Sequence, residues 1–194
     1  MSLPVRILVA GIVGGILVFF MGFFEHAVLN WGGREIHSLP SDGYFRELFK
    51  EEKLEHKVYT FPAMPDKGKG AEDQQRYADE WKAGPSGFLI IAPPGEEPMS
   101  GMTLVLELVT NIIAALIAAW IVSLLSQEKP FLWRWKVVVL MAIFGWVSLS
   151  ASYGIWYRFP WPFIRDDLLC TILEWCVGGA AIAGIVTRDA KKDS

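Results

Sequence analysis

The chain has 194 residues, of which 53% are hydrophobic and 13% aromatic, and its mean hydropathy is +0.33. This composition excludes an ordinary soluble domain and, equally, a disordered chain. The formal net charge is −3, and nothing in the distribution of the charges supports a nucleic-acid partner.

Residues 7–25 are the first long apolar segment, and we predict that they form a transmembrane helix. The apolar run is longer than the core of a typical signal peptide, and no small-x-small cleavage pattern ends it, so the segment is expected to be retained. Gly11 and Gly15 form a GxxxG pair, which lets a second helix approach closely. Their face continues at spacings of three and four residues. It comprises Gly11, Gly15, Val18, Gly22, Glu25 and His26.

Residues 26–100 are rich in charged residues, proline and glycine and contain no spanning segment. We predict a small extracytoplasmic α/β domain here. Because two short strands are marginal on their own, the domain is expected to lean on the membrane helices. In chain order, the expected elements are a helix from Ser41 or Asp42 to about His56, a strand at 58–61, a helix at 71–83 and a strand at 88–91.

Residues 101–126 are the second predicted transmembrane helix, because about 20 apolar residues at about 1.5 Å each cross the hydrocarbon core. Glu107 lies inside this segment, and a charged side chain near the centre of a lipid-facing helix costs about 2.5–3.5 kcal/mol on insertion scales. Glu107 is therefore expected to face protein, water or a partner. In the alternative interpretation it only snorkels or hydrogen-bonds to Asn111. The residues that share its face are Thr103, Asn111, Ala114 and Ala118.

Residues 137–154 and 167–187 are the third and fourth predicted transmembrane helices. The connection between them is rich in aromatic residues and is expected to lie at the membrane interface. The predicted fold class is an α-helical membrane protein with four transmembrane helices and a small α/β extracytoplasmic domain between helices one and two. The two cysteines, Cys170 and Cys176, lie about 120° apart around the fourth helix and cannot easily bridge each other.

Lysine and arginine residues set the predicted orientation. They precede the first helix, occupy the loop between helices two and three, and follow the fourth helix, whereas the long first loop is net acidic. By the positive-inside rule both termini are expected in the cytoplasm, with 188–194 as a cytoplasmic tail. Residues 26–100 then face outward, which is the periplasm in a bacterium.

Three helices are expected to bring polar side chains to one depth in the outer half of the membrane. We predict a pocket there that is able to hold a cation, a proton relay or the head group of a quinone or lipid. Its predicted lining is Glu25, His26, Glu107, Asn111 and Glu174. In the alternative interpretation, each acid pairs separately with Arg158, Arg165 or a backbone group and only orients the helices.

Neither a metal site nor a catalytic constellation is expected. The three histidines, His26, His37 and His56, fall on the outer side, but no ligand pair has a diagnostic spacing. Haem attachment lacks a CxxCH motif, and neither cysteine lies in a CxxC motif or beside a histidine. The sequence leaves the cofactors unassigned.

The segments GGILVFFMGFFEHAVL, AGPSGFLIIAPPGEEPMS and TNIIAALIAAW resemble stretches of uncharacterised small bacterial four-helix membrane proteins that have no assigned activity. The resemblance implies a multi-pass protein of the bacterial inner membrane and supplies no site. The threading is also similar to that of claudins, but the paired loop cysteines of that family are missing.

For function, we expect a non-catalytic accessory or assembly subunit of a larger membrane protein complex, with lipids and other membrane subunits as partners. Small-residue helix faces and abundant tryptophan suit packing against other chains. The alternative is a small-ligand module for a quinone, lipid, ion or proton, and a transporter is included in that class. An enzyme is the third and least favoured class.

Overall fold

The computed structural model describes residues 1–31, 33–95, 97–125 and 128–187. The chain divides into two compact units, one made of Met1–Ile36 with Met99–Ser194 and the other of His37–Pro98. The first unit holds the long helices, and the second holds a two-stranded sheet. The segment up to Ile36 therefore belongs with the helices, whereas the sequence led us to begin the small domain at residue 26.

Four helical segments of the described chain are long and apolar enough to cross a membrane, as the sequence predicts. Segments of 23 to 27 residues reach the thickness of a hydrocarbon core, which is about 30 Å, at a rise of about 1.5 Å per residue. In chain order they are α1 (Leu3–Phe24) with the π-helical turn η1 (Glu25–Leu29), α4 (Gly101–Ser123), α5 (Phe131–Ser148) with α6 (Ser150–Tyr157), and α7 (Trp161–Val186).

The third and fourth spans begin earlier than the hydropathy pattern predicts. α5 starts at Phe131, not at 137, and α7 starts at Trp161, not at 167. A proline stands immediately before each of these helices, at Pro130 and Pro160. Proline fixes φ near the helical value and has no N–H donor. Both properties are tolerated at the start of a helix, so each helix begins directly after its proline.

As a consequence, most of the expected connections are helical. Arg134 and Lys136 belong to α5, although we assigned them to a loop. The aromatic stretch that we placed at the membrane interface forms the end of α6 and the start of α7, and only 158–160 separates the two helices. Arg158 ends α6 in a left-handed conformation, with φ of 59°.

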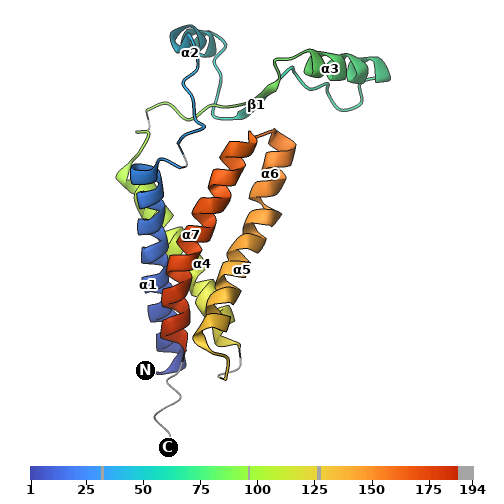
Figure 1. Ribbon diagram of the computed structural model, residues 1–194. Coiled ribbons are helices and arrows are strands. Elements are labelled where there is room, and N and C mark those ends of the chain that lie inside the picture. Colours follow the sequence, from blue (N-terminus) through green and yellow to red (C-terminus); the bar gives the residue numbers. More distant parts are fainter. Residues whose placement is uncertain (32, 96, 126–127, 188–194) are drawn as a thin grey trace, which may run out of the picture. The chain divides into compact units, whose positions relative to one another are not determined.

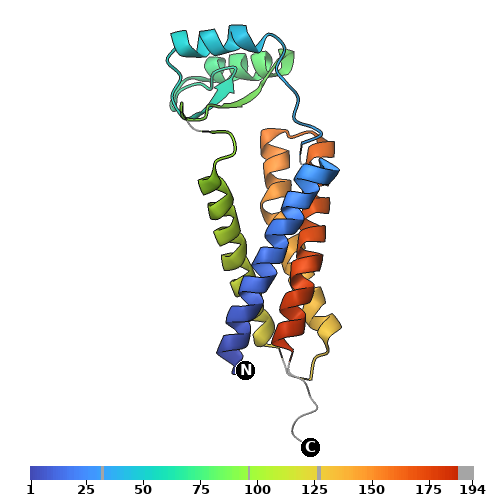
Figure 2. The same ribbon diagram turned by 90° about the vertical axis from the view of Figure 1, so that its left-hand side faces the viewer.

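Helix α1 packs along both α4 and α7, and α5 packs against α7 (Figure 1). Turning the molecule by 90° shows the same neighbours, with the N terminus and the end of α7 at one end of the bundle (Figure 2). Glycines allow this close approach. A Cβ atom on Gly15 would lie 2.5 Å from the Cα of Ile112, and one on Gly178 would lie 2.9 Å from the carbonyl oxygen of Gly14. The fully apolar core lies toward the same end and is built mainly from alanine, valine and isoleucine.

Two arginines cap helix ends at that end of the bundle. Arg134 is completely buried and donates hydrogen bonds to the carbonyl oxygens of Val122, at 2.8 Å, and Lys129, at 3.2 Å. Arg6 donates to the carbonyl oxygens of Ile185, at 3.0 Å, and Thr187. The last carbonyl groups of a helix lack intrahelical donors and carry partial negative charge, so a guanidinium there is stabilising.

The smaller unit contains α2 (Asp42–Glu51), β1 (Val58–Phe61), α3 (Ala71–Ala83) and β2 (Gly87–Ile90). The order of helices and strands is the predicted one, although α2 ends before His56. β1 pairs with β2 in antiparallel register, with Val58 opposite Ile90. Trp81 of α3 contacts Phe88 of β2, with ring centroids 6.3 Å apart, so an aromatic contact holds this helix to the sheet.

Candidate functional site

Four of the five predicted site residues line one cavity between α1, α4 and α7. The cavity has a volume of about 350 Å³. Its polar lining is His26 of η1, Glu107 and Asn111 of α4, and Glu174 of α7. The rest of the wall is mainly apolar and aromatic, from Phe19, Gly22, Phe23, Met99 and Leu104. The structure thus brings the polar faces of three helices together at one level.

Glu174 lies directly against the backbone of α1 at Gly22. A Cβ atom at position 22 would come within 2.7 Å of the Glu174 Oε1 atom. Glycine therefore leaves the space that the carboxyl group occupies. This contact sets the level of Glu174 in the bundle at the C-terminal part of α1, even though α7 begins earlier than we expected.

Glu107 is held by its own helix. The Asn111 Nδ2 group donates to the Glu107 Oε1 atom at 3.1 Å, across one turn of α4. The alternative interpretation of the sequence predicts this hydrogen bond between Glu107 and Asn111. The same pair also lines the cavity, so the hydrogen bond orients the carboxyl group there.

Glu25, the fifth predicted residue, lies behind the cavity rather than on its surface. Its exposed fraction is 0%, and neither carboxylate oxygen has a hydrogen-bond partner. The neighbours of its side chain are Cys170 and Glu174 of α7. Residue 25 opens the π-helical turn η1, in which the N–H of Asn30 bonds to the Glu25 carbonyl oxygen. A buried carboxyl group without a donor is costly, and π-helical turns are frequent at functional sites.

A second, smaller cavity lies on the other side of Glu174. Its volume is about 150 Å³, and it shares His26 and Glu174 with the first cavity. Its remaining lining is Phe163, Asp167, Cys170 and Thr171. Glu174 is therefore reached from two sides, and the charged groups that act on it, Glu25, Glu107 and Asp167, are all acids.

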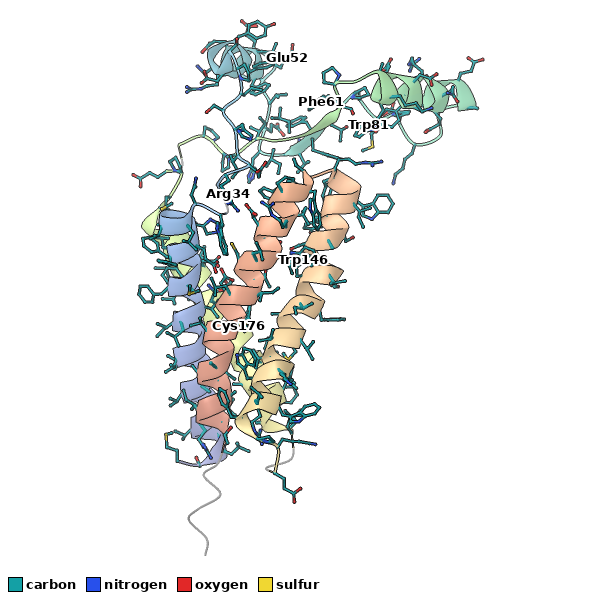
Figure 3. The ribbon with its side chains drawn as sticks, in the orientation of Figure 1. Arg34, Glu52, Phe61, Trp81, Trp146 and Cys176 are labelled. Atoms are coloured by element: carbon teal, nitrogen blue, oxygen red, sulfur yellow. The ribbon has the colours of Figure 1, made fainter. Side chains whose placement is uncertain are left out.

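The nearby basic side chains are held by a different acid. Asp166 is only 1% exposed and accepts two hydrogen bonds from Arg34, at 2.9 and 2.7 Å, and two from Arg165, at 3.0 and 2.8 Å. Figure 3 shows Arg34 beside the start of α7. The alternative interpretation gave Arg165 to one of the glutamates, but its ion pair is with Asp166. Within the described ranges, Glu25, Glu107 and Glu174 form no ion pair.

Sequence reasoning missed the cluster of Arg34, Asp166 and Arg165. The two arginines lie on opposite sides of the unit His37–Pro98, and Arg34 stands 132 positions before Asp166 in the chain. No local spacing could reveal that contact. Asp167, Cys170 and Glu174 follow one another at spacings of three and four residues, and this helical spacing was the available signal for the place of Asp167 and Cys170 beside Glu174.

No group of three or more histidine, cysteine, aspartate or glutamate side chains could hold a metal ion in the part of the chain that the structure describes. The expectation of no metal site stays a prediction, and the cofactors stay unassigned. The chemistry that these residues offer is that of carboxyl groups in an apolar setting. They can bind a proton or a cation, and the aromatic wall can contact the apolar part of a ligand.

No family model matches the chain, and no curated protein or solved structure matches it either. The class of protein therefore follows from the fold and the site. Four long apolar helices are compatible with a multi-pass membrane protein, and three of them enclose an acid-lined cavity. The resemblance to small bacterial membrane proteins stays a prediction.

Proposed function

We propose that this chain is a membrane-embedded small-ligand protein that binds a small organic cation in the cavity lined by Glu107, Asn111 and Glu174. The observation that carries the proposal is the unpartnered carboxyl group of Glu25, wholly buried behind Glu174. It belongs to a cluster of acids that has no basic partner among the described ion pairs. Such a cluster attracts positive charge, and the cavity beside it is large enough for a small ligand.

The lining favours an organic cation over the other ligands that the sequence left open. Phe19 and Phe23 form part of the wall, and aromatic faces attract cations that are only weakly hydrated. A hard metal ion requires several oxygen ligands that converge on one point. No such group of side chains is found among the described residues, so the lining gives a metal ion no support. The carbonyl of a quinone and the phosphate of a lipid carry no positive charge, so neither gains the attraction that this acid-rich lining offers to a cation.

The binding of tetraphenylphosphonium, an aromatic organic cation, to the purified full-length protein tests the proposal. Loss of one charge contact costs about 1.5–3 kcal/mol, so Glu174→Gln and Glu107→Gln should each weaken binding by about ten- to hundredfold. Titration calorimetry in detergent measures the affinity. The control is Glu72→Gln in α3, which removes an acid of the smaller unit and should leave the affinity unchanged. Equal affinity in all four proteins would refute the cation site.

The accessory-subunit function remains a second proposal, supported by the exposure of the third span. Only 6% of the most apolar window of Phe131–Tyr157 is buried, against 22–33% in the other three spans. A groove of about 400 Å³ between α4, α5 and α7 includes Gly145 and Trp146, and the indole Nε1 of Trp146 is buried without an acceptor (Figure 3). A transmembrane helix of a partner chain would cover this apolar side.

Gentle solubilisation followed by native mass spectrometry tests the subunit function. A stoichiometric complex with another membrane chain is the expected result, with lipids as additional partners. Full recovery as a monomer that is thermally stable in mild detergent would contradict it. Both proposals place the chain in a bacterial inner membrane, with both termini cytoplasmic and the unit His37–Pro98 in the periplasm.

A further inference from the structure

We propose that Glu25 and Glu174 share one proton when the cavity is empty, and that a bound organic cation displaces it, so that the site exchanges a cation for a proton. This inference rests on the proposed cation site and adds its regulation by pH.

The two acids lie against each other in a buried place. Glu25 is wholly buried, its oxygens have no donor, and its side-chain neighbours are Cys170 and Glu174. A carboxylate offers only acceptors. Two carboxyl groups in one buried site therefore interact favourably when one is protonated and its O–H donates to the other, and they repel each other when both are charged.

The charged groups that face the pair are mainly acids. Helix α4 contributes Glu107, and α7 contributes Asp167 and Cys170. His26 of η1 lines both cavities, and it is the one described group on these elements that can become positive there. It is exposed, and it forms no described ion pair with the two acids.

The two arginines that contact the start of α7 are already engaged by another acid. Arg34 and Arg165 together direct four hydrogen bonds to the buried carboxylate of Asp166. Moving either guanidinium away would take two of these four hydrogen bonds from a buried carboxylate, which is unfavourable. The pair of Glu25 and Glu174 is thus compensated by a proton in the empty state.

The exchange balances in charge. The empty site holds two carboxyl groups and one proton, with a net charge of −1. A monovalent cation enters the larger cavity beside Glu174, the O–H bond of the pair breaks, and one proton leaves, so the net charge is again −1. We place the route of the proton in the smaller cavity, because the side chains of His26 and Asp167 line it, and imidazole and carboxyl groups are the usual members of proton relays.

Titration calorimetry with tetraphenylphosphonium in two buffers of different ionisation enthalpy counts the protons released by the full-length protein. We expect about one proton per cation bound near neutral pH. The apparent affinity should then fall by about tenfold for each unit of pH decrease over the range in which the pair holds its proton.

A second measurement assigns the proton to this pair. In Glu25→Gln the amide N–H donates to Glu174, which can then stay charged without a proton. This variant should release far less than one proton for each cation that it binds, whereas Glu72→Gln should release as many as the unmodified protein. Undiminished release from Glu25→Gln would overturn the role of Glu25.

The outcomes separate the two proposals. If the unmodified protein does not bind tetraphenylphosphonium, the proposed cation site fails. If it binds the cation but releases no proton in either buffer, the cation site stands and the exchange is overturned. The two-buffer measurement uses the unmodified protein, so the result does not depend on whether Glu25→Gln folds.

Discussion

Single atoms decide how close the acids come to one another. Glu174 reaches α1 because residue 22 has no side chain, and Glu25 is buried because it opens the π-helical turn that follows. The sequence could predict that Glu107, Asn111 and Glu174 share a level, because their spacing places them on polar faces of apolar helices. It could not predict the burial of Glu25, since a π-helical turn changes the direction of a side chain without leaving a pattern in the sequence.

Gly22→Ala tests this contact at the scale of one residue. The added Cβ would lie 2.7 Å from Glu174 Oε1, so the carboxyl group must move away from α1. We expect the affinity for tetraphenylphosphonium to fall by about tenfold, equivalent to about 1.4 kcal/mol. Stability should change by less than about 1 kcal/mol, because the displaced atoms end a flexible side chain and alanine favours the helix.

The matched control is Gly145→Ala in α5, where a Cβ would meet no heavy atom within 4 Å. It should bind the cation like the unmodified protein and should be equally or slightly more stable. Titration calorimetry and thermal unfolding in detergent provide the two readouts. Equal affinity in the two variants would mean that Gly22 does not position Glu174.

At the scale of the helices, local patterns and long-range contacts determine different things. The period of the apolar residues located all four spans, and the glycine faces indicated where α1, α4 and α7 approach. The helix starts at Phe131 and Trp161 could not be fixed by hydropathy, because proline and charged residues within the first turn resemble a loop. The cluster of Arg34, Asp166 and Arg165 required the tertiary fold, since it joins segments far apart in the chain.

Gly178→Val tests the packing of α7 on α1. The Cβ at this position would lie 2.5 Å from a side-chain atom of Val18 and 2.9 Å from the carbonyl oxygen of Gly14. The backbone of α1 cannot move as a flexible side chain can, so the helices must separate. Overpacking of this kind costs about 1–3 kcal/mol. Thermal unfolding in detergent should show the loss, whereas Gly145→Val, which has open space, should change stability by less than about 0.5 kcal/mol. Equal stability of the two valine variants would contradict the close approach.

At the scale of the whole molecule, basic side chains gather at one end of the helical bundle. Arg6 and Arg134 cap the C-terminal ends of α7 and α4 at the end of the bundle that also contains the N terminus. By the positive-inside rule, these basic residues predict that this end of the bundle lies in the cytoplasm. The acidic unit His37–Pro98 leaves the helices from the opposite ends of α1 and α4, as their bounds require.

Labelling of single cysteines in intact cells tests this orientation. Glu72→Cys in α3 should react with a maleimide that cannot cross the membrane, whereas Lys129→Cys, at the loop before α5, should react only after the cells are permeabilised. The physical reason is that the membrane potential and the anionic inner leaflet retain lysine and arginine on the cytoplasmic side. The unmodified protein serves as the blank, because Cys170 is buried and Cys176 is partly buried in α7. Labelling of Lys129→Cys from outside, with protection of Glu72→Cys, would reverse the threading and would move the acid-lined cavity to the cytoplasmic half of the membrane.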